Sequence, residues 1–175
     1  MVLGSTEGRG LHHLIYELVD KSVDEALASS CDHIQITILS DSRVTVTDNG
    51  RGIPVAIHAK TKLSGLETVM TILHAGGKFG GSGYKVASGL HGVGVSAVNA
   101  LSETMRVETS RDGHRSAPEY GRGAPRSKSR DLGRTQLVGT PTTFLPHRPT
   151  FAPPAYPSDP WAREFRQSAS PPKTL

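Results

Sequence analysis

Several residue types are scarce in this 175-residue sequence, and each scarcity excludes a class of protein. A single cysteine, Cys31, excludes an internal disulfide and a cysteine-rich zinc site, and makes the reducing cytoplasm the expected compartment. No run of about 18 apolar residues occurs, so we expect no membrane-spanning helix. The N-terminal residues lack a basic region followed by an apolar stretch, so no secretory signal is expected either.

Glycine and proline divide the rest of the sequence into three unlike parts. Eight of the 19 glycines lie between Gly76 and Gly94, and nine of the 12 prolines follow residue 140. The apolar fraction of 35% is enough for one domain with a hydrophobic core. We therefore predict a single domain over residues 1–145 and an extended or disordered proline-rich tail over residues 146–175.

Apolar residues recur with helical or strand spacing through the first 105 residues. The alternation around Ile36 and Val46 predicts two strands joined in a hairpin by the turn SDS. Pro141 lacks a backbone donor, which places the last predicted strand at an edge of the sheet or at a bulge. The predicted elements are helices over residues 11–29, 66–75 and 95–101, and strands over residues 33–39, 43–48, 104–111 and 138–146.

Basic residues are unevenly distributed along the chain. The net charge of +4 permits a polyanionic partner, and residues 106–134 carry eight arginines and lysines against four acidic residues. This stretch is typical of a solvated loop, the interpretation that we favour, or of a small nucleic-acid-binding module. The module would need interleaved aromatics or a known motif, and the stretch offers neither.

The polar face of the first predicted helix carries a candidate general base. His13 lies four residues before Glu17 and Asp24 seven residues after it, so all three share one face. A glutamate held by a histidine neighbour is suited to take a proton from an attacking water. A solvated polar face is the alternative interpretation of the same residues.

The segment TDNGRGIP, residues 47–54, places Asp48 at the end of a predicted strand, before a glycine-containing loop. Gly50 and Gly52 permit positive φ angles or a close approach of the backbone to a ligand. A buried carboxylate here can accept a hydrogen bond from an exocyclic amine such as N6 of adenine. A plain Asn-Gly turn is the alternative.

A glycine-rich stretch, residues 74–101, contains GLHGVG and leads into a predicted helix. Backbone N–H groups without side-chain cover, followed by a helix N-terminus, can bind an anion. Lys78 and Lys85 precede them and can fold over a polyphosphate. The spacing matches neither a Walker A motif nor a dinucleotide-binding motif, and a flexible surface linker is the alternative.

In this order, the three segments resemble the ATPase domain shared by DNA gyrase B and the ParE subunit of topoisomerase IV, which are GHKL ATPases. The likeness is carried by GSTEGRGLHH, LHHLIYELVDKSVDEAL, DNGRGIP, TILHAGGKF and SGYKVASGLHGVGVSAVNALSE. It covers residues 1 to about 105, and VGTPTTFLP more faintly. It implies an α+β fold, the GHKL (Bergerat) two-layer sandwich with helices on one face of a mixed sheet, and hence a truncated ATP-binding domain over residues 1–145.

The resemblance also implies roles for individual residues. Glu17 matches the catalytic glutamate that activates water against the γ-phosphate of ATP, and His13 matches the histidine that orients it. Asp48 matches the aspartate that binds the adenine amine. The other ATP-binding positions implied are Arg51, Gly52, Ile53 and Pro54 beside the base, Thr140 near Asp48, Lys78, Tyr84 and Lys85 in the lid, and Gly89, Leu90, His91, Gly92, Val93, Gly94 and Val95 in the phosphate-binding loop.

The function implied by the resemblance is ATP hydrolysis coupled to DNA strand passage by a type II DNA topoisomerase, with ATP and Mg²⁺ as cofactors. The expected partners of the full-length enzyme are a gyrase A-type subunit, double-stranded DNA and a second copy of the B-type subunit, and no membrane. A nucleotide-binding remnant without hydrolysis or topoisomerase activity is the alternative. Gyrase and topoisomerase IV are both left open.

The sequence departs from this family at several places. Lys21 stands where the family has a magnesium-binding asparagine, and an ammonium group cannot ligate the ion, so no metal ligand is assigned. We expect Lys21 to pair with Glu17, four residues earlier, and to reduce its basicity. The likeness is expected to fade from about residue 107, and the N-terminal dimerisation arm and the transducer domain are expected to be missing. The chain is then a fragment, a frame-disrupted copy or a functional short form.

Overall fold

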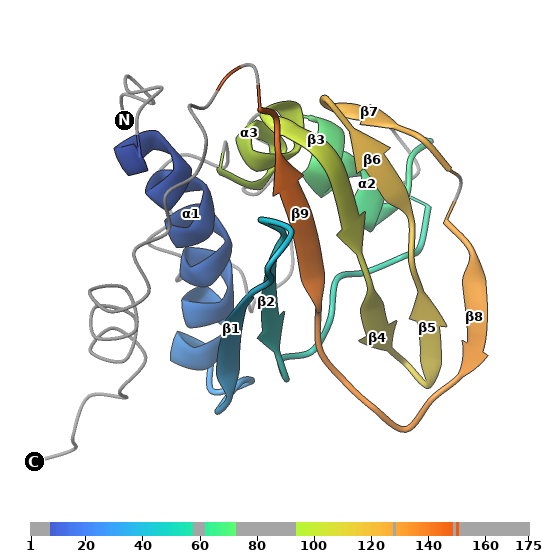
Figure 1. Cartoon of the computed structure of the whole chain (residues 1–175). Coiled ribbons are helices and arrows are strands. Elements are labelled where there is room, and N and C mark those ends of the chain that lie inside the picture. Colours follow the sequence, from blue (N-terminus) through green and yellow to red (C-terminus); the bar gives the residue numbers. More distant parts are fainter. Residues whose placement is uncertain (1–7, 58–61, 73–93, 128, 149, 151–175) are drawn as a thin grey trace, which may run out of the picture.

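Helices and short strands make up most of the described part of the chain, which in this computed structural model comprises residues 8–57, 62–72, 94–127, 129–148 and 150 (Figure 1). The elements in chain order are α1 (Gly8–Leu27), β1 (Ile34–Ile38), β2 (Val44–Asp48), α2 (Gly65–Thr71), α3 (Gly94–Ala100), β3 (Ser102–Val107), β4 (Thr109–Arg111), β5 (His114–Ser116), β6 (Glu119–Gly121), β7 (Ala124–Pro125), β8 (Asp131–Arg134) and β9 (Thr142–Pro146).

The three helices form close to where the apolar spacing predicts them. α1 follows the amphipathic pattern and ends where Ser29 adopts a φ of 55° and bonds back to the Ala26 carbonyl at 2.9 Å. α2 begins at an N-cap, because the Ser64 hydroxyl accepts a hydrogen bond from the Glu67 amide at 3.0 Å. The end predicted for this helix, residues 73–75, lies outside the described residues.

The predicted hairpin of β1 and β2 is confirmed, with Ile36 opposite Val46. It is the edge of a six-stranded sheet in the order β1-β2-β9-β3-β6-β7, and β4, β5 and β8 form a second, three-stranded sheet (Figure 1). The α+β fold is thus confirmed. Every pairing between the named strands is antiparallel, so the parallel component of a mixed sheet does not occur among the described strands.

The prediction that the last strand lies at an edge is wrong. β9 pairs with β2 on one side and with β3 on the other, so it is a central strand. Pro141 precedes the strand, where no ladder hydrogen bond requires its missing donor, and its carbonyl accepts a bond from the Glu108 amide at 2.8 Å. A register shift does occur in this pairing, but it lies in β3, between Ser102 and Thr104.

The basic stretch is also not the loop that its charge favours. Residues 106–134 run from the end of β3 to the end of β8 and contain all three strands of the smaller sheet, together with β6 and β7 of the larger one. Charged side chains are compatible with these short strands because they stay on the surface: all four residues of β8 are exposed.

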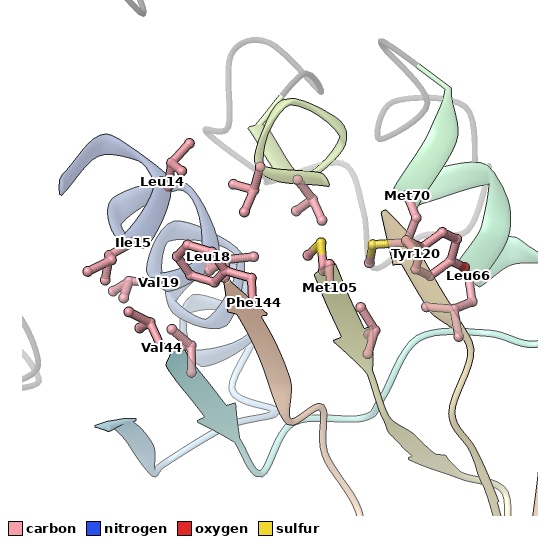
Figure 2. Packing of buried hydrophobic residues seen from close by; sticks show 14 residues of the cluster. Leu14, Ile15, Leu18, Val19, Val44, Leu66, Met70, Met105, Tyr120 and Phe144 are labelled. Atoms are coloured by element: carbon pink, nitrogen blue, oxygen red, sulfur yellow. The ribbon is translucent and has the colours of Figure 1, made fainter. Parts of the chain in front are cut away.

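The core lies between the helices and the larger sheet (Figure 2). α1 contributes Leu14 and Leu18, and the sheet contributes Phe144 of β9 and Met105 of β3, all at most 4% exposed. Burial of such side chains stabilises the fold by roughly 1.5–3 kcal/mol each. Because α1 and β2 both contribute to this core, their positions relative to each other are fixed by its packing. None of the described helices is long and apolar enough to cross a membrane.

Candidate functional site

Asp48, the last residue of β2, is the centre of the candidate site. Its side chain is buried, with a relative exposure of 9%. The Ser22 hydroxyl, on α1, donates to Oδ2 at 3.1 Å, and the Gly50 amide donates to Oδ1 at 3.0 Å. An ionised carboxylate offers about four lone-pair positions, so Asp48 keeps acceptor capacity for a ligand.

Burial raises the pKa of Asp48, and the nearby Glu25 carboxylate raises it further. The hydrogen bonds from the Gly50 amide and the Ser22 hydroxyl oppose this rise of the pKa, because they stabilise the charged form. The sequence pattern places Ser22 only beside the apolar stripe of α1. It is 2% exposed, and its role becomes visible only when α1 packs against the end of β2.

The segment that leads into β9 returns to the backbone of Asp48. The Thr140 amide donates to the Asp48 backbone carbonyl at 3.1 Å, which places the predicted residue Thr140 beside Asp48. Gly139, with a φ of 126°, lies so close that a Cβ there would be 3.0 Å from Asn49 Cα. Only glycine adopts that conformation readily and leaves that space.

The loop after Asp48 is fixed from two sides. Arg51 makes a bidentate ion pair with Glu25 of α1, at 3.0 and 3.2 Å, and 41% of its side chain remains exposed. Gly52 has a φ of 74°, and a Cβ on it would lie 2.7 Å from the Ser110 carbonyl oxygen. The positive φ predicted for Gly52 is thus confirmed, and the close approach of its backbone is to β4, while an approach to a ligand stays a prediction.

Two residues of β4 that the sequence does not single out hold the next part of the loop. The Thr109 hydroxyl accepts a hydrogen bond from the Ile53 amide at 2.7 Å and donates to the Ile53 carbonyl at 3.1 Å. The Arg111 guanidinium donates to the Gly52 carbonyl at 2.9 Å. Pro54 accepts from the Leu66 amide, at the start of α2, at 2.8 Å. Thr109 and Arg111 lie 56 and 59 residues after the loop residues to which they bond, so no local sequence pattern indicates these contacts.

The candidate general base and the start of α3 meet in the folded chain. A Cβ on Gly94, the first residue of α3, would lie 2.9 Å from the Glu17 Cδ and 3.2 Å from its Cβ. No side chain fits at residue 94 unless Glu17 moves. The next residue, Val95, is 6% exposed and belongs to the core.

His13 and Lys21 lie on the same helix as Glu17. His13 is exposed, and its ring lies 6.3 Å from the Tyr16 ring at an interplanar angle of 60°. The Lys21 ammonium bonds to Asp24 Oδ2 at 2.8 Å, a partner that the sequence analysis does not predict, and the pairing of Lys21 with Glu17 stays a prediction. The i,i+3 spacing on a helix brings Lys21 and Asp24 together as readily as the i,i+4 spacing brings Lys21 to Glu17.

The remaining candidate residues fall outside the described part of the chain. They are the lid residues Lys78, Tyr84 and Lys85 and the phosphate-loop residues Gly89, Leu90, His91, Gly92 and Val93. Within the described residues, no group of three or more His, Cys, Asp and Glu side chains is placed to hold a metal ion.

Comparison with known proteins shows what this arrangement is similar to. The family model described as histidine kinase-, DNA gyrase B-, and HSP90-like ATPase matches residues 6–139. The DNA gyrase B subunit of Halalkalibacterium halodurans is 53% identical over 146 residues, which are 83% of this chain and 23% of that protein. The corresponding gyrase B protein of Clostridium acetobutylicum is 50% identical over 169 residues, 97% of this chain and 26% of that protein.

A third relative, the DNA gyrase B subunit of Thermotoga maritima, is 55% identical over 146 residues, 83% of this chain and 23% of that protein. The chain therefore spans about a quarter of the length of these curated relatives. The match with the Clostridium acetobutylicum protein covers 97% of the chain and so continues beyond residue 107, where the likeness is expected to fade.

Proposed function

We propose that this chain, which belongs to the family of histidine kinase-, DNA gyrase B- and HSP90-like ATPases, binds ATP at the end of β2 and hydrolyses it with Glu17 as the general base. The observation that carries the proposal is Asp48, a buried carboxylate that is oriented by two donors and still able to accept a bond. A buried, ionised acceptor favours a ligand with an amine donor over a ligand without one, because the second ligand would leave the carboxylate unpaired at a cost in binding free energy.

The adenine base lies against the loop after β2. Asp48 accepts the hydrogen bond of the exocyclic amine, and Thr140 lies beside it through its bond to the Asp48 carbonyl. Ile53 and Pro54 form the wall next to the base, and Gly52 allows the backbone to approach. Arg51, held by Glu25, supplies the rim of the site. Support for this placement comes from the fixed backbone of the loop, whose polar groups are bonded to β4 and α2.

The triphosphate extends from the base towards the start of α3. Backbone amides from Gly89 to Val95 hold the phosphates, and the lid residues Lys78, Tyr84 and Lys85 cover them. Glu17 lies against Gly94, and this contact supports a position at the γ-phosphate, where the carboxylate takes a proton from the attacking water. His13 orients the Glu17 side chain.

Magnesium fits this chain poorly. At the position that the resemblance gives to a magnesium ligand, the ammonium of Lys21 has no lone pair and is paired with Asp24. We therefore assign no metal ligand, and Lys21 itself supplies positive charge near the phosphates.

In the full-length protein, the ATPase domain drives DNA strand passage as part of a DNA gyrase-like type II topoisomerase. The partners are a gyrase A-type subunit, double-stranded DNA and a second B-type subunit, and the compartment is the cytoplasm. The domain comprises residues 1–145, with residues 146–175 as a separate tail. The gyrase B relatives support this assignment through their identity with the chain.

Calorimetry with ATP tests the base pocket. Asp48→Asn keeps the size of the side chain but removes its charge and one acceptor, and it should weaken ATP binding about 10- to 150-fold, since a bond to a charged acceptor is worth roughly 1.5–3 kcal/mol. Asp41→Asn is the matched control, because Asp41 lies on the hairpin turn with half of its side chain exposed. Equal affinity of the Asp48→Asn variant and the wild-type chain would remove Asp48 from the pocket.

A further inference from the structure

The loop that follows Asp48 has its backbone hydrogen bonds satisfied by another sheet. Residues 52 and 53 belong to no strand or helix, so their polar groups need partners elsewhere. Thr109 of β4 provides both an acceptor and a donor for the main chain of Ile53, at 2.7 and 3.1 Å. Arg111, two residues further along β4, donates to the Gly52 carbonyl at 2.9 Å.

A hydroxyl is well suited to this position. It can accept a bond and donate one at the same time, whereas valine, which has the same shape, can do neither. Thr109 is only 1% exposed, so water cannot readily take its place. A valine there would leave the amide and the carbonyl of Ile53 without their partner.

The same strand also reaches the backbone behind Asp48. Ser110 exchanges hydrogen bonds with Gly139, from the Ser110 amide at 2.9 Å and from the Gly139 amide at 3.2 Å. Gly139 packs against the backbone of Asp48 and Asn49, and the next residue, Thr140, bonds to the Asp48 carbonyl. β4 is therefore connected both to the loop and to the strand end that carries the carboxylate.

From this geometry we infer that Thr109 is a positioning residue for base recognition: it fixes the Ile53 wall at a set distance from Asp48, so that an adenine fits between the two. The inference rests on the proposed function and adds a residue that does not itself touch the nucleotide. It follows that loss of the hydroxyl reduces both the affinity for ATP and the preference for an adenine base.

The test compares Thr109→Val, Thr109→Ser and the wild-type chain by calorimetry with ATP and with inosine triphosphate, which has an oxygen in place of the adenine amine. Thr109→Val should bind ATP about 10-fold more weakly, the effect of losing hydrogen bonds worth about 1.4 kcal/mol. Its preference for ATP over inosine triphosphate should fall as well. Thr109→Ser keeps the hydroxyl and should bind ATP within about twofold of wild type.

Thr143→Val is the matched control, since Thr143 shares a hydrogen bond of 2.9 Å with Thr45 inside the larger sheet. It should leave both affinities unchanged. A purely structural role of Thr109 would lower the binding of both nucleotides by one factor and leave their ratio unchanged. That unchanged ratio would overturn the inference, as would a serine variant that binds as weakly as the valine variant.

A second measurement covers the case in which Thr109→Val does not fold. In the wild-type chain, the Ile53 amide should exchange slowly with solvent and more slowly still with ATP bound. Exchange at the rate of an exposed amide would overturn the inference. The proposed function fails separately, if the wild-type chain does not bind ATP or if Asp48→Asn binds it equally well.

Discussion

Asp48, at the end of β2, and Asp131, at the start of β8, carry the same carboxylate in opposite surroundings. Asp48 is 9% exposed and receives hydrogen bonds from Ser22 and Gly50. The Asp131 side chain is 64% exposed and faces a histidine ring nitrogen at 3.5 Å. Burial makes the first an acceptor that a ligand can use with selectivity, and solvent screens the second.

The same contrast separates the region around the end of β2 from the smaller sheet. Around the end of β2, charged groups meet in defined geometry, as in the bidentate pair of Arg51 with Glu25. On the smaller sheet, charges lie on exposed strands, as along β8. The regions nevertheless depend on each other, because β4 of the smaller sheet supplies the hydrogen bonds that fix the loop after Asp48. The smaller sheet therefore contributes to the candidate site through side chains that bond to the backbone of the loop, and not through its net charge.

The largest expected effect concerns Glu17, a half-buried residue of α1. Glu17→Ala should reduce ATP hydrolysis about 10²–10⁴-fold, because a general base acts in the transition state, and should leave ATP binding near wild type. Single-turnover hydrolysis is to be measured in a chimaera in which this chain replaces the matching residues of a full-length gyrase B protein. Glu103→Ala, on the exposed side of β3, is the control. A loss of binding in proportion to the loss of rate would make Glu17 structural.

An intermediate effect concerns the hydroxyl that bonds to Asp48. Burial raises the pKa of Asp48 and the Ser22 hydrogen bond lowers it. Only the ionised carboxylate is a full acceptor, so ATP affinity should fall as the pH drops through this pKa. Ser22→Ala should move that fall to a higher pH, because the carboxylate loses a donor that stabilises its charged form.

Calorimetric titrations with ATP over a series of pH values measure this shift. The control is Ser102→Ala, a buried serine whose hydroxyl bonds to the Val98 carbonyl and not to Asp48. The expected direction is fixed by the chemistry, because removing a donor to a carboxylate can only disfavour its charged form. A shift to lower pH would contradict the role given to Ser22.

The smallest effect is expected at Lys21, whose side chain is 39% exposed and bonded to Asp24. Lys21→Asn introduces an oxygen ligand and should raise magnesium-dependent hydrolysis in the chimaera by about threefold, a change of the size typical of exposed charges. Rates with and without magnesium are to be compared, with Lys62→Asn on an exposed residue as the control. An equal or faster rate with Lys21 intact would show that this residue does not limit the use of the metal.

Local patterns predict the local parts of this molecule. The hydrogen bonds of α1 and of the β1–β2 hairpin join residues near in sequence, so spacing alone locates them. The position of Asp48 at the end of a strand follows from the same hairpin. The sequence indicates Glu17 as a general base and Gly94 as part of an anion-binding loop for separate chemical reasons. Their contact in the fold is not predictable from sequence spacing.

The parts that the sequence does not predict depend on pairing between distant residues. β9 is central because it inserts between β2 and β3, where Thr143 meets Thr45, 98 residues away. The arginine-rich stretch forms strands because its neighbours in the fold, and not its charge, decide its structure. Thr109 cannot be singled out from the sequence, since a threonine in a strand is ordinary until its partner is known.

The most direct test of the central claim, that Asp48 reads the adenine amine, is the ratio of the dissociation constants of inosine triphosphate and ATP for the wild-type and Asp48→Asn chains. Wild type should prefer ATP by about 10-fold or more, because inosine offers an acceptor where the aspartate needs a donor. Asp48→Asn presents an amide that can donate to that acceptor, so the preference should vanish or reverse. An Asp48→Asn chain that keeps the wild-type preference for ATP would contradict the account.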